Sequence, residues 1–468
     1  MSISSMTRST ESVPQSDEQK LTAVLQKALD KNTGIIKKMN IVPLQADEPP
    51  IYISMAEFVE STKLPPRRIN TEKWQSVSKD IVATGNVFDH MKEVAVHSSG
   101  AALDEISSLW ATTGEAFERY AMTLEIEGNE KTCLEAELDE PVIDVEKLIL
   151  FTPEQYEKDN FMFRPYRADR PLRWGKGISL TNGNTYYLPA DLYSPYAPAT
   201  ELTGPLVACY STGYAAGPDY KWAIKSGLCE VVERDAFMFY WLTKNTPPRL
   251  DMQLLKPKLS AKLQKLIDFQ GVEVSVHWLK TDVDLPSIVC FLNAKRGRGF
   301  AMGASTNLSW EVAVEKAILE AYHTLNWTVD LDRWMYEEIE LEGISDFSEH
   351  VRFYLNEKNH HLLDFILKDN EHDGTSEFLA QFEGRNIEID DAIDQLTTLG
   401  FEPLVVDRTG EDLESIGIVV SCVVIPGMHP LHVGLGSEHL DTRRLEQVAS
   451  NINVPMPQTL NLDPHPFP

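Results

Sequence analysis

Residues 218–244 read PDYKWAIKSGLCEVVERDAFMFYWLTK, and the rest of the chain is interpreted around them. Pro218 suits a first helical turn and no other proline occurs before Pro247, so about seven turns of helix fit between them. Glu230 and Glu233 share one narrow face of this helix, while apolar residues fill most of its other sides. Such a helix is buried, and buried carboxylates without partners are costly. The two glutamates therefore require cations.

An earlier stretch has the same pattern. Residues 112–122 read TTGEAFERYAM, and Glu115, Glu118 and Arg119 repeat the ExxER spacing that ends at Arg234 in the central helix. One ExxER motif is common as an ordinary i,i+4 ion pair on a solvated helix. Two copies in apolar-rich helices favour a shared cation site, and oxygen ligands from two helices suit Mg²⁺.

Composition limits the class of protein. The 468 residues suffice for two or three packed units or one large elaborated domain, and 43% of them are hydrophobic. A formal net charge of −28 argues against nucleic-acid or anionic-membrane partners, because phosphate affinity requires clustered Lys and Arg. Five scattered cysteines without a CxxC motif suggest neither a disulfide framework nor structural zinc. Because we find neither a signal-peptide core nor a membrane span, we expect a soluble, cytoplasmic protein.

The succession of polar, helical and apolar segments predicts three parts of the chain. Residues 1–80 form an N-terminal extension, with a disordered start of about 18 polar residues and then a helix over residues 18–30. Residues 81–450 form the main body, in which the charged residues 331–393 are interpreted as an insertion or a partner-facing lobe. Residues 451–468 form a proline-rich tail that cannot join a helix or a central strand.

The main body is predicted to combine helices and strands in an α+β arrangement. Residues 80–122 are helix-like, and further helices are expected at 254–269 and 310–328. The last of these carries Glu320 and His323 at i,i+3 spacing, where they either share a site or are a surface acid and an incidental histidine. A proline-bearing link is expected at 42–68, a hairpin turn at 180–184, and strands at 186–188, 206–211, 272–279, 287–293, 300–304, 404–407 and 418–425.

Taken in order, these pieces resemble the YcaO family, and more narrowly its stand-alone azoline-forming cyclodehydratases, which modify ribosomally made peptides. The match runs from about residue 98 to the last residue. It comprises both ExxER helices, STGYAAG (211–217), SGLCEVVERDAF (226–237), ILEA (318–321), VDRTGEDLESIG (406–417), VVIPGMHPLHVG (423–434) and the terminal PHPFP (464–468). The resemblance implies a YcaO-type fold, with mixed β-sheets and packed helices around an ATP and Mg²⁺ site.

By this resemblance the protein is an ATP-dependent cyclodehydratase. A Cys, Ser or Thr side chain of a precursor peptide attacks the preceding amide carbonyl, ATP phosphorylates the resulting oxyanion, and phosphate departs to leave a thiazoline or oxazoline. Mg²⁺ neutralises charge on the phosphates. The implied partners are the precursor peptide, a protein that binds its leader segment, and a flavin-dependent dehydrogenase that oxidises azoline to azole. Family members are often homodimers.

The resemblance also implies roles for individual residues as magnesium ligands, nucleotide contacts or catalytic base. The base is the free carboxylate of the last residue, Pro468, which reverses the expectation of a loose tail. The magnesium ligands are Glu115, Glu118, Glu230 and Glu233, and the nucleotide contacts are Arg119, Ser226, Arg234, Glu320 and His323.

The chain departs from the family's pattern in two places, the third helix and one strand. His323 and Leu325 stand where Gln and Arg are common in the third helix, and Cys422 stands where a strand often supplies an arginine to the nucleotide. A histidine can donate a hydrogen bond as Gln does, whereas a thiol cannot replace a guanidinium. Besides the cyclodehydratase, two alternatives stay open: a thioamide- or amidine-forming relative, and a degraded paralogue that acts as a scaffold subunit.

Overall fold

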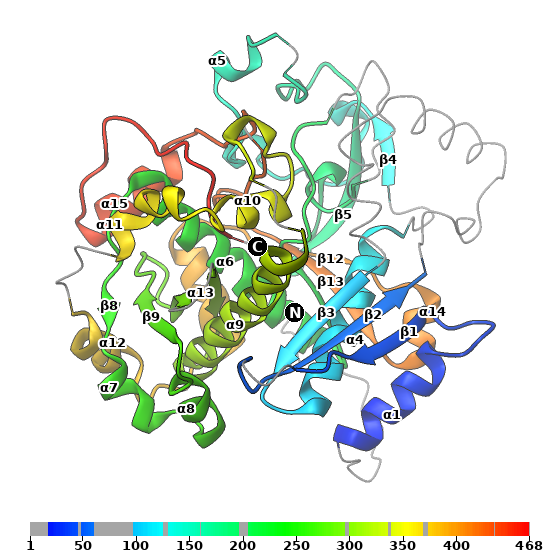
Figure 1. Ribbon diagram of the computed structural model, residues 1–468. Helices are drawn as coiled ribbons and strands as arrows, with labels where there is room; N and C mark the ends of the chain where they lie inside the picture. The colour runs from blue at the N-terminus through cyan, green and yellow to red at the C-terminus, as the bar shows by residue number, and fades with distance from the viewer. Residues whose placement is uncertain are drawn as a thin grey trace.

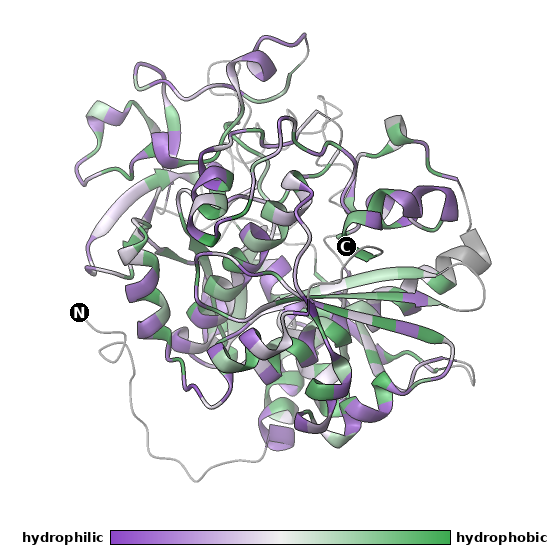
Figure 2. Ribbon diagram, turned by 90° about the vertical axis from the view of Figure 1, so that its left-hand side faces the viewer, coloured by the Kyte–Doolittle hydropathy of each residue, from purple (hydrophilic) through white to green (hydrophobic). Residues whose placement is uncertain are grey.

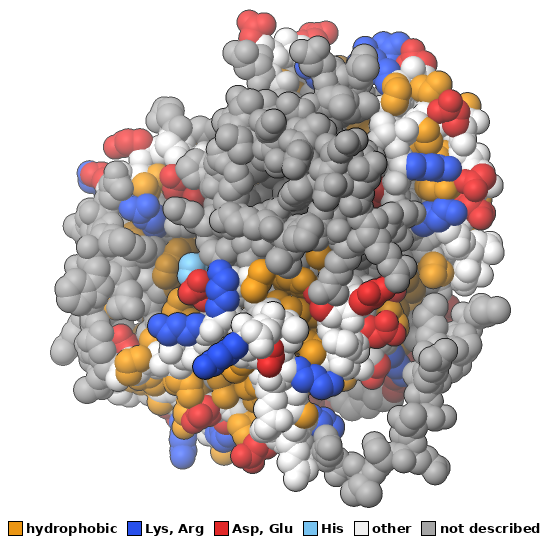
Figure 3. Space-filling model, turned by 90° about the vertical axis from the view of Figure 1, so that its right-hand side faces the viewer, with side chains coloured by type: hydrophobic (Ala, Val, Ile, Leu, Met, Phe, Trp, Pro, Cys, Tyr) orange, Lys and Arg blue, Asp and Glu red, His pale blue; other side chains and the backbone are white. Residues whose placement is uncertain are grey.

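Three antiparallel sheets, with helices packed around and between them, make up the described part of the chain (Figure 1). The computed structural model describes residues 17–44, 48–59, 97–124, 130–159, 161–195, 205–294, 299–335, 338–367, 373–434 and 436–467. The expected α+β class is confirmed. Hydrophobic and hydrophilic residues alternate along the outer helices (Figure 2), and acidic and basic side chains are interspersed over the face shown in Figure 3. None of the helices in these residues is long and apolar enough to cross a membrane.

The N-terminal part forms a three-stranded sheet in the order β1 (Ile36–Ile41), β2 (Tyr52–Phe58) and β3 (His97–Ala102). α4 (Glu105–Met122) packs against β2 and β3, and α1 (Asp17–Ala28) packs against α4. α1 corresponds to the helix predicted near the start of the chain. The alternating burial of β2 shows why it is a strand, since Ser54, Ala56 and Phe58 face the interior.

This sheet overturns two local predictions. The proline-bearing link expected at residues 42–68 contains β2. The segment 80–122, expected to be helix-like overall with a loop at 97–100 left open, contains a strand over residues 97–102. The sequence of β3, HSSGAA, carries neither β-branched nor aromatic residues, so only its pairing with β2 identifies it as a strand. Residues 60–96, which include the start of that expected helix, lie outside the described residues, as do residues 1–16.

The second sheet has the order β4 (Glu130–Cys133), β5 (Leu172–Ser179), β12 (Leu404–Asp407), β13 (Val419–Val424) and β7 (Tyr214–Gly217), and β6 (Thr185–Pro189) pairs with β5. The predicted hairpin is confirmed as the turn between β5 and β6. The strand predicted at residues 206–211 is wrong, because the pairing partner of β13 is the small-residue stretch that follows it. Leu206 and Cys209 are buried because they pack into the apolar core, and neither belongs to a strand.

α6 (Tyr220–Thr243), the predicted central helix, lies between this sheet and the third one. Asp219 caps its first turn by accepting a hydrogen bond from the Trp222 N–H (2.8 Å). A Cβ on Gly227 would lie 2.3 Å from the carbonyl oxygen of Gly213, so only glycine allows the helix to approach that loop. The small residues of STGYAAG therefore bring α6 close to the second sheet.

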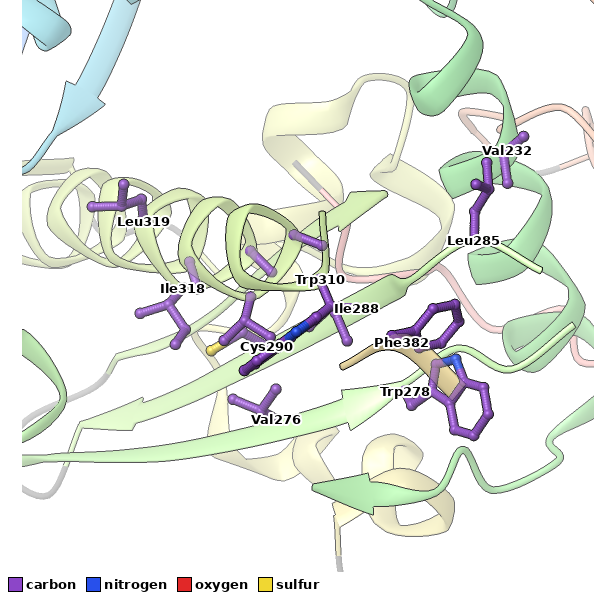
Figure 4. Packing of buried hydrophobic residues seen from close by; sticks show 14 of the residues in the cluster. Val232, Val276, Trp278, Leu285, Ile288, Cys290, Trp310, Ile318, Leu319 and Phe382 are labelled. Atoms are coloured by element: carbon purple, nitrogen blue, oxygen red, sulfur yellow. The ribbon is translucent and has the colours of Figure 1, made fainter. Parts of the chain in front are cut away.

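The third sheet has the order β11 (Phe300–Thr306), β10 (Ser287–Ala294), β9 (Val272–Trp278) and β8 (Arg249–Leu250), and α9 (Trp310–Met335) packs on β10 and β11. A Cβ on Gly303 would lie 2.3 Å from the Ala321 nitrogen, which shows how closely helix and strand approach. Figure 4 shows Trp278, Trp310 and Phe382 filling the apolar core beside this sheet.

The remaining helices are short. The helix expected at residues 254–269 is divided by Pro257, which has no N–H to continue the hydrogen-bond ladder. The short helices are α5 (Pro153–Tyr156), α7 (Met252–Leu255), α8 (Ala261–Ile267), α10 (Phe347–Phe353), α11 (Asp364–Leu367), α12 (Thr375–Phe382), α13 (Ile389–Thr398), α14 (Glu411–Ile416) and α15 (Arg443–Ile452). The last described residues of the chain lie between α6 and α10 (Figure 1).

Candidate active site

The two glutamates of α4 each accept a hydrogen bond from the backbone of a strand. The Ser99 N–H of β3 donates to Glu115 Oε2 (2.7 Å), and the Ala216 N–H of β7 donates to Glu118 Oε1 (2.8 Å). Arg119 forms an ion pair with Glu115, with 2.6 Å between Nη2 and Oε1. α4 therefore directs one carboxylate to each of two different sheets.

α6 repeats this arrangement. The Gly213 N–H donates to Glu230 Oε2 (3.1 Å), and the Thr306 N–H of β11 donates to Glu233 Oε2 (2.9 Å). The guanidinium of Arg234 lies between the two remaining oxygens, with Nη2 3.2 Å from Glu230 Oε1 and Nη1 3.0 Å from Glu233 Oε1. Arg234 is thus one of the cations that these buried glutamates require.

Glu320 of α9 is fixed in the same way, because its Oε2 accepts the Ala304 N–H of β11 (2.7 Å). Each of the five glutamates therefore has one oxygen held by a backbone amide, which sets the direction of the other. The second oxygens of Glu118 and Glu320 accept no hydrogen bond from the described residues. Those two oxygens can bind a cation without breaking a protein contact.

The electrostatics of the group favour an added positive charge. Burial, aided by the nearby charges of Glu230 and Glu115, raises the pKa of Glu118 to about 8. Burial, followed by the charge of Glu233, raises the pKa of Glu320 to about 8. Burial also raises the pKa of Glu230, although Arg234 acts in the opposite direction. Without a cation the carboxyl groups of Glu118 and Glu320 are therefore mostly protonated at neutral pH, and a bound cation would favour their charged forms.

A cavity of about 310 Å³ opens beside α6 and α9. Six of the predicted site residues line it, whereas Glu115, Glu118 and Arg119 do not. Glu118 is nevertheless close enough for the charge of Glu230, which lines the cavity, to raise its pKa. The predicted residues in its wall are Ser226, Glu230, Glu233, Arg234, Glu320 and His323, and the others are Ala101, Cys229, Ala304, Ser305, Thr306, Asn307, Lys316 and Leu319.

A protein-family model described as YcaO cyclodehydratase, ATP- and Mg²⁺-binding, matches residues 99–429. The chain belongs to the YcaO family. ATP and Mg²⁺ are therefore the ligands to consider at this YcaO site, and the matched segment contains all five anchored glutamates.

The YcaO chain is also similar to a curated protein. An uncharacterized protein of Methanothermobacter thermautotrophicus is 27% identical over 210 residues, which are 44% of this chain and 51% of the relative. The chain thus spans about half the length of that curated relative.

Solved structures show the same fold. A heterocyclase in complex with substrate and cofactor gives a TM-score of 0.75 at 21% identity, over 98% of this chain and 59% of the other. YcaO from Methanopyrus kandleri, bound with AMPPCP and Mg²⁺, gives 0.57 at 17% identity, over 89% and 91% of the two chains. The E. coli microcin synthetase McbBCD complex with pro-MccB17 bound gives 0.54 at 13% identity, over 92% and 96%.

The carboxylates of this YcaO site fit Mg²⁺ held together with phosphates. Among the described residues, no three His, Cys, Asp or Glu side chains converge closely enough to hold a metal ion by themselves. Mg²⁺ commonly takes only one or two carboxylates and completes its octahedron with water and substrate phosphates. Glu118 and Glu320 match that requirement, because a backbone amide anchors one oxygen of each and the other oxygen accepts no hydrogen bond from the described residues.

The two departures from the YcaO pattern have different surroundings. His323 lines the cavity, and burial lowers its pKa, so the neutral ring is favoured as a hydrogen-bonding group. Cys422 is fully buried on β13 and does not line the cavity. The nearby Arg408 does not replace the missing guanidinium, because it donates to the carbonyls of Ala121 (3.1 Å) and Leu124 (2.6 Å) at the end of α4.

Sequence reasoning missed Lys316, which lines the cavity one turn before Glu320 on α9. It and Arg234 are the two cationic side chains in the cavity wall. A lysine on an amphipathic helix is usually a solvated surface residue, so its type alone gives no signal. Its i,i+4 and i,i+7 spacing to Glu320 and His323 was the one available clue.

The last described residue of this YcaO chain lies beside the site. Pro468, whose carboxylate is the predicted base, lies outside the described residues. Its neighbour Phe467 is fully buried, and the centre of its ring lies 4.0 Å from the guanidinium carbon of Arg234. Residues 464–467, the last part of the tail that the structure describes, are all buried.

Proposed function

We propose that this YcaO protein is an ATP-dependent cyclodehydratase that converts Cys, Ser or Thr residues of a ribosomally made precursor peptide into thiazolines or oxazolines. Membership in an ATP- and Mg²⁺-binding family supports the proposal, and the anchored carboxylates around the cavity carry it. The peptide's own side chain closes the ring, ATP takes the amide oxygen as phosphate, and ADP is the other product. We place the reaction in the cytoplasm, because ATP and newly made peptide are both present there.

In this proposal Glu115, Glu118, Glu230 and Glu233 hold Mg²⁺, which would neutralise charge on the phosphates of the bound nucleotide. The backbone amides that anchor these carboxylates keep them oriented before the nucleotide arrives, so little reorganisation is needed on binding. Arg234 limits the repulsion between the two glutamates of α6.

The nucleotide contacts are assigned to residues of the cavity wall. Ser226, Glu320 and His323 provide hydrogen-bonding groups, and Lys316 provides a positive charge on the side of α9. Lys316 forms no ion pair with a described residue and is largely exposed, so its ammonium can move onto a phosphate. It would supply part of the charge that Cys422 does not. Arg119, which pairs with Glu115, would act from the α4 side.

The proposed catalytic base is the terminal carboxylate of Pro468, in keeping with the family resemblance. The position of Phe467 against Arg234 supports it, since Phe467 is the residue before Pro468 and its ring packs on a predicted site residue. A chain extended by one residue after Pro468 therefore should lose most azoline formation. Full activity of that extended chain would favour a thioamide- or amidine-forming enzyme.

The proposed partners are a precursor peptide, a protein that binds its leader segment and a flavin-dependent azoline dehydrogenase, with the chain itself acting as a homodimer. The similarity to the microcin synthetase complex, which was solved with pro-MccB17 bound, supports the first two. The direct test is the mass of the precursor peptide after incubation with this protein, its partner, Mg²⁺ and ATP. Loss of one water per ring is the expected result, and an unchanged mass with active partner would refute the proposal.

A further inference from the structure

The ring of Phe467 fills a gap on α6 next to the Mg²⁺ and nucleotide site. Its face is turned to Arg234, with 4.0 Å from the guanidinium carbon to the ring centre, and its edge meets Phe237, with ring centres 4.9 Å apart. Arg234 and Phe237 are three residues apart on α6 and therefore share a face. The ring of Phe467 thus rests on the same side of α6 that carries the paired carboxylates.

The terminal segment is held in this position by hydrogen bonds to its backbone and to one side chain. The Tyr354 hydroxyl donates to the Pro464 carbonyl (2.5 Å), and His350 Nδ1–H donates to the His465 carbonyl (2.8 Å). His465 Nε2–H donates to the carbonyl of His432 (2.7 Å). His465 is completely buried, and the flanking prolines restrict the backbone further. The tail is therefore built to deliver one aromatic ring to one place.

Arg234 depends on that ring because its other contacts do not enclose it. Glu230 and Glu233 pair with the nitrogens at the edge of the guanidinium, whereas the ring of Phe467 covers its flat face. An aromatic face attracts a cation and excludes water, and this attraction is strongest where the pair is desolvated. The side chain of Arg234 is 14% exposed, and Phe467 is completely buried.

We propose that Phe467 is a positioning residue: its ring holds the Arg234 guanidinium, and through it Glu230 and Glu233, in the arrangement that binds Mg²⁺ and nucleotide. Nucleotide binding then requires that the ring of Phe467 is packed against Arg234. This inference rests on the proposed function, and it adds a role for the tail that is separate from any role of its terminal carboxylate.

The test is the affinity of the full-length protein for Mg²⁺ with a non-hydrolysable ATP analogue, measured by titration calorimetry without peptide or partner. Phe467→Leu keeps an apolar side chain but removes the ring, and it should weaken binding about tenfold, the order of a desolvated cation–π contact. Replacing Phe467 with pentafluorophenylalanine keeps the ring shape but reverses its charge distribution, and it should weaken binding at least as much. Leu462→Ala, at a 51% exposed position of the same tail, is the matched control and should bind as the wild type does.

A double-mutant cycle separates positioning from simple anchoring of the tail. In an Arg234→Lys background the effect of Phe467→Leu should shrink to less than about twofold, because the planar cation on which the ring acts is gone. If the two effects multiply instead, or if the pentafluoro variant binds as the wild type does, the inference is wrong. If the wild type binds no Mg²⁺ and nucleotide, the proposed function fails and the inference fails with it.

Discussion

Replacing Glu233 with Gln removes one negative charge from the site while keeping its shape. In the wild type one oxygen of Glu233 accepts the Thr306 N–H and the other pairs with Arg234. The glutamine oxygen can keep the first contact, but its NH₂ group then faces the guanidinium, and two donors meet. A buried group that loses its partner costs about 1–3 kcal/mol. Lower repulsion with Glu230 and Glu320 offsets part of that cost.

We therefore expect Glu233→Gln to change the free energy of unfolding by no more than about 2 kcal/mol. Its activity should fall at least about 1000-fold, or about 4 kcal/mol, since transition-state charge on the phosphates loses a ligand of its counter-ion. Azoline formation is followed by peptide mass and stability by chemical denaturation. Glu311→Gln is the control, because Glu311 is an exposed glutamate in the first turn of α9. Wild-type activity of Glu233→Gln would refute the role assigned to this carboxylate, whereas global unfolding would refute the stability estimate.

Three further predictions concern other residues. Lys316→Ala should raise the KM for ATP about tenfold in steady-state kinetics, the order of one lost charge contact to phosphate. Lys316→Arg should keep most of the affinity for ATP, and Lys265→Ala, at an exposed site on α8, should leave the KM unchanged. An unchanged KM in Lys316→Ala contradicts the assignment. Burial lowers the pKa of His350 from 6.5 to about 4, so its contribution to stability is complete above pH 6.5 and declines as the pH falls toward 4. Between pH 8 and 5 the wild type should therefore lose about 2 kcal/mol more stability than His350→Gln, as seen by urea unfolding at each pH, and parallel curves would contradict this. Cys422→Arg introduces the residue that the resemblance implies at this position, but it places a guanidinium at a fully buried position. Thermal unfolding should therefore show that the free energy of unfolding falls by about 3 kcal/mol or more. A stable variant with tighter nucleotide binding would show that this position reaches the site.

The elements predicted correctly are those whose own residues determine them. The central helix follows from apolar residues on nearly all sides between two prolines, and β9 and β10 follow from runs rich in β-branched and aromatic residues. The strand over residues 97–102 was missed because its small residues carry no propensity, and the strand expected at residues 206–211 was wrong because burial without pairing looks the same in a sequence. Pairing between distant segments decides both cases.

The site was predictable only in part for a similar reason. Repeated ExxER spacing identifies the glutamates, and the structure brings Glu230, Glu233 and Glu320 to one cavity. Which backbone amide anchors each carboxylate depends on the approach of strands that lie far away in the sequence. Lys316 carries no motif that points to the site, and the PHPFP motif that contains Phe467 indicates a role for the terminal carboxylate but none for the ring.

The central claim is that carboxylates from α4 and α6 hold Mg²⁺ bound to a nucleotide. The most direct measurement is a crystal structure of the full chain with a non-hydrolysable ATP analogue and Mn²⁺ in place of Mg²⁺, in which anomalous scattering locates the metal. The account predicts anomalous peaks between the triphosphate and the oxygens of Glu118, Glu230 and Glu233. A nucleotide bound elsewhere, or metal peaks away from these carboxylates, would contradict it.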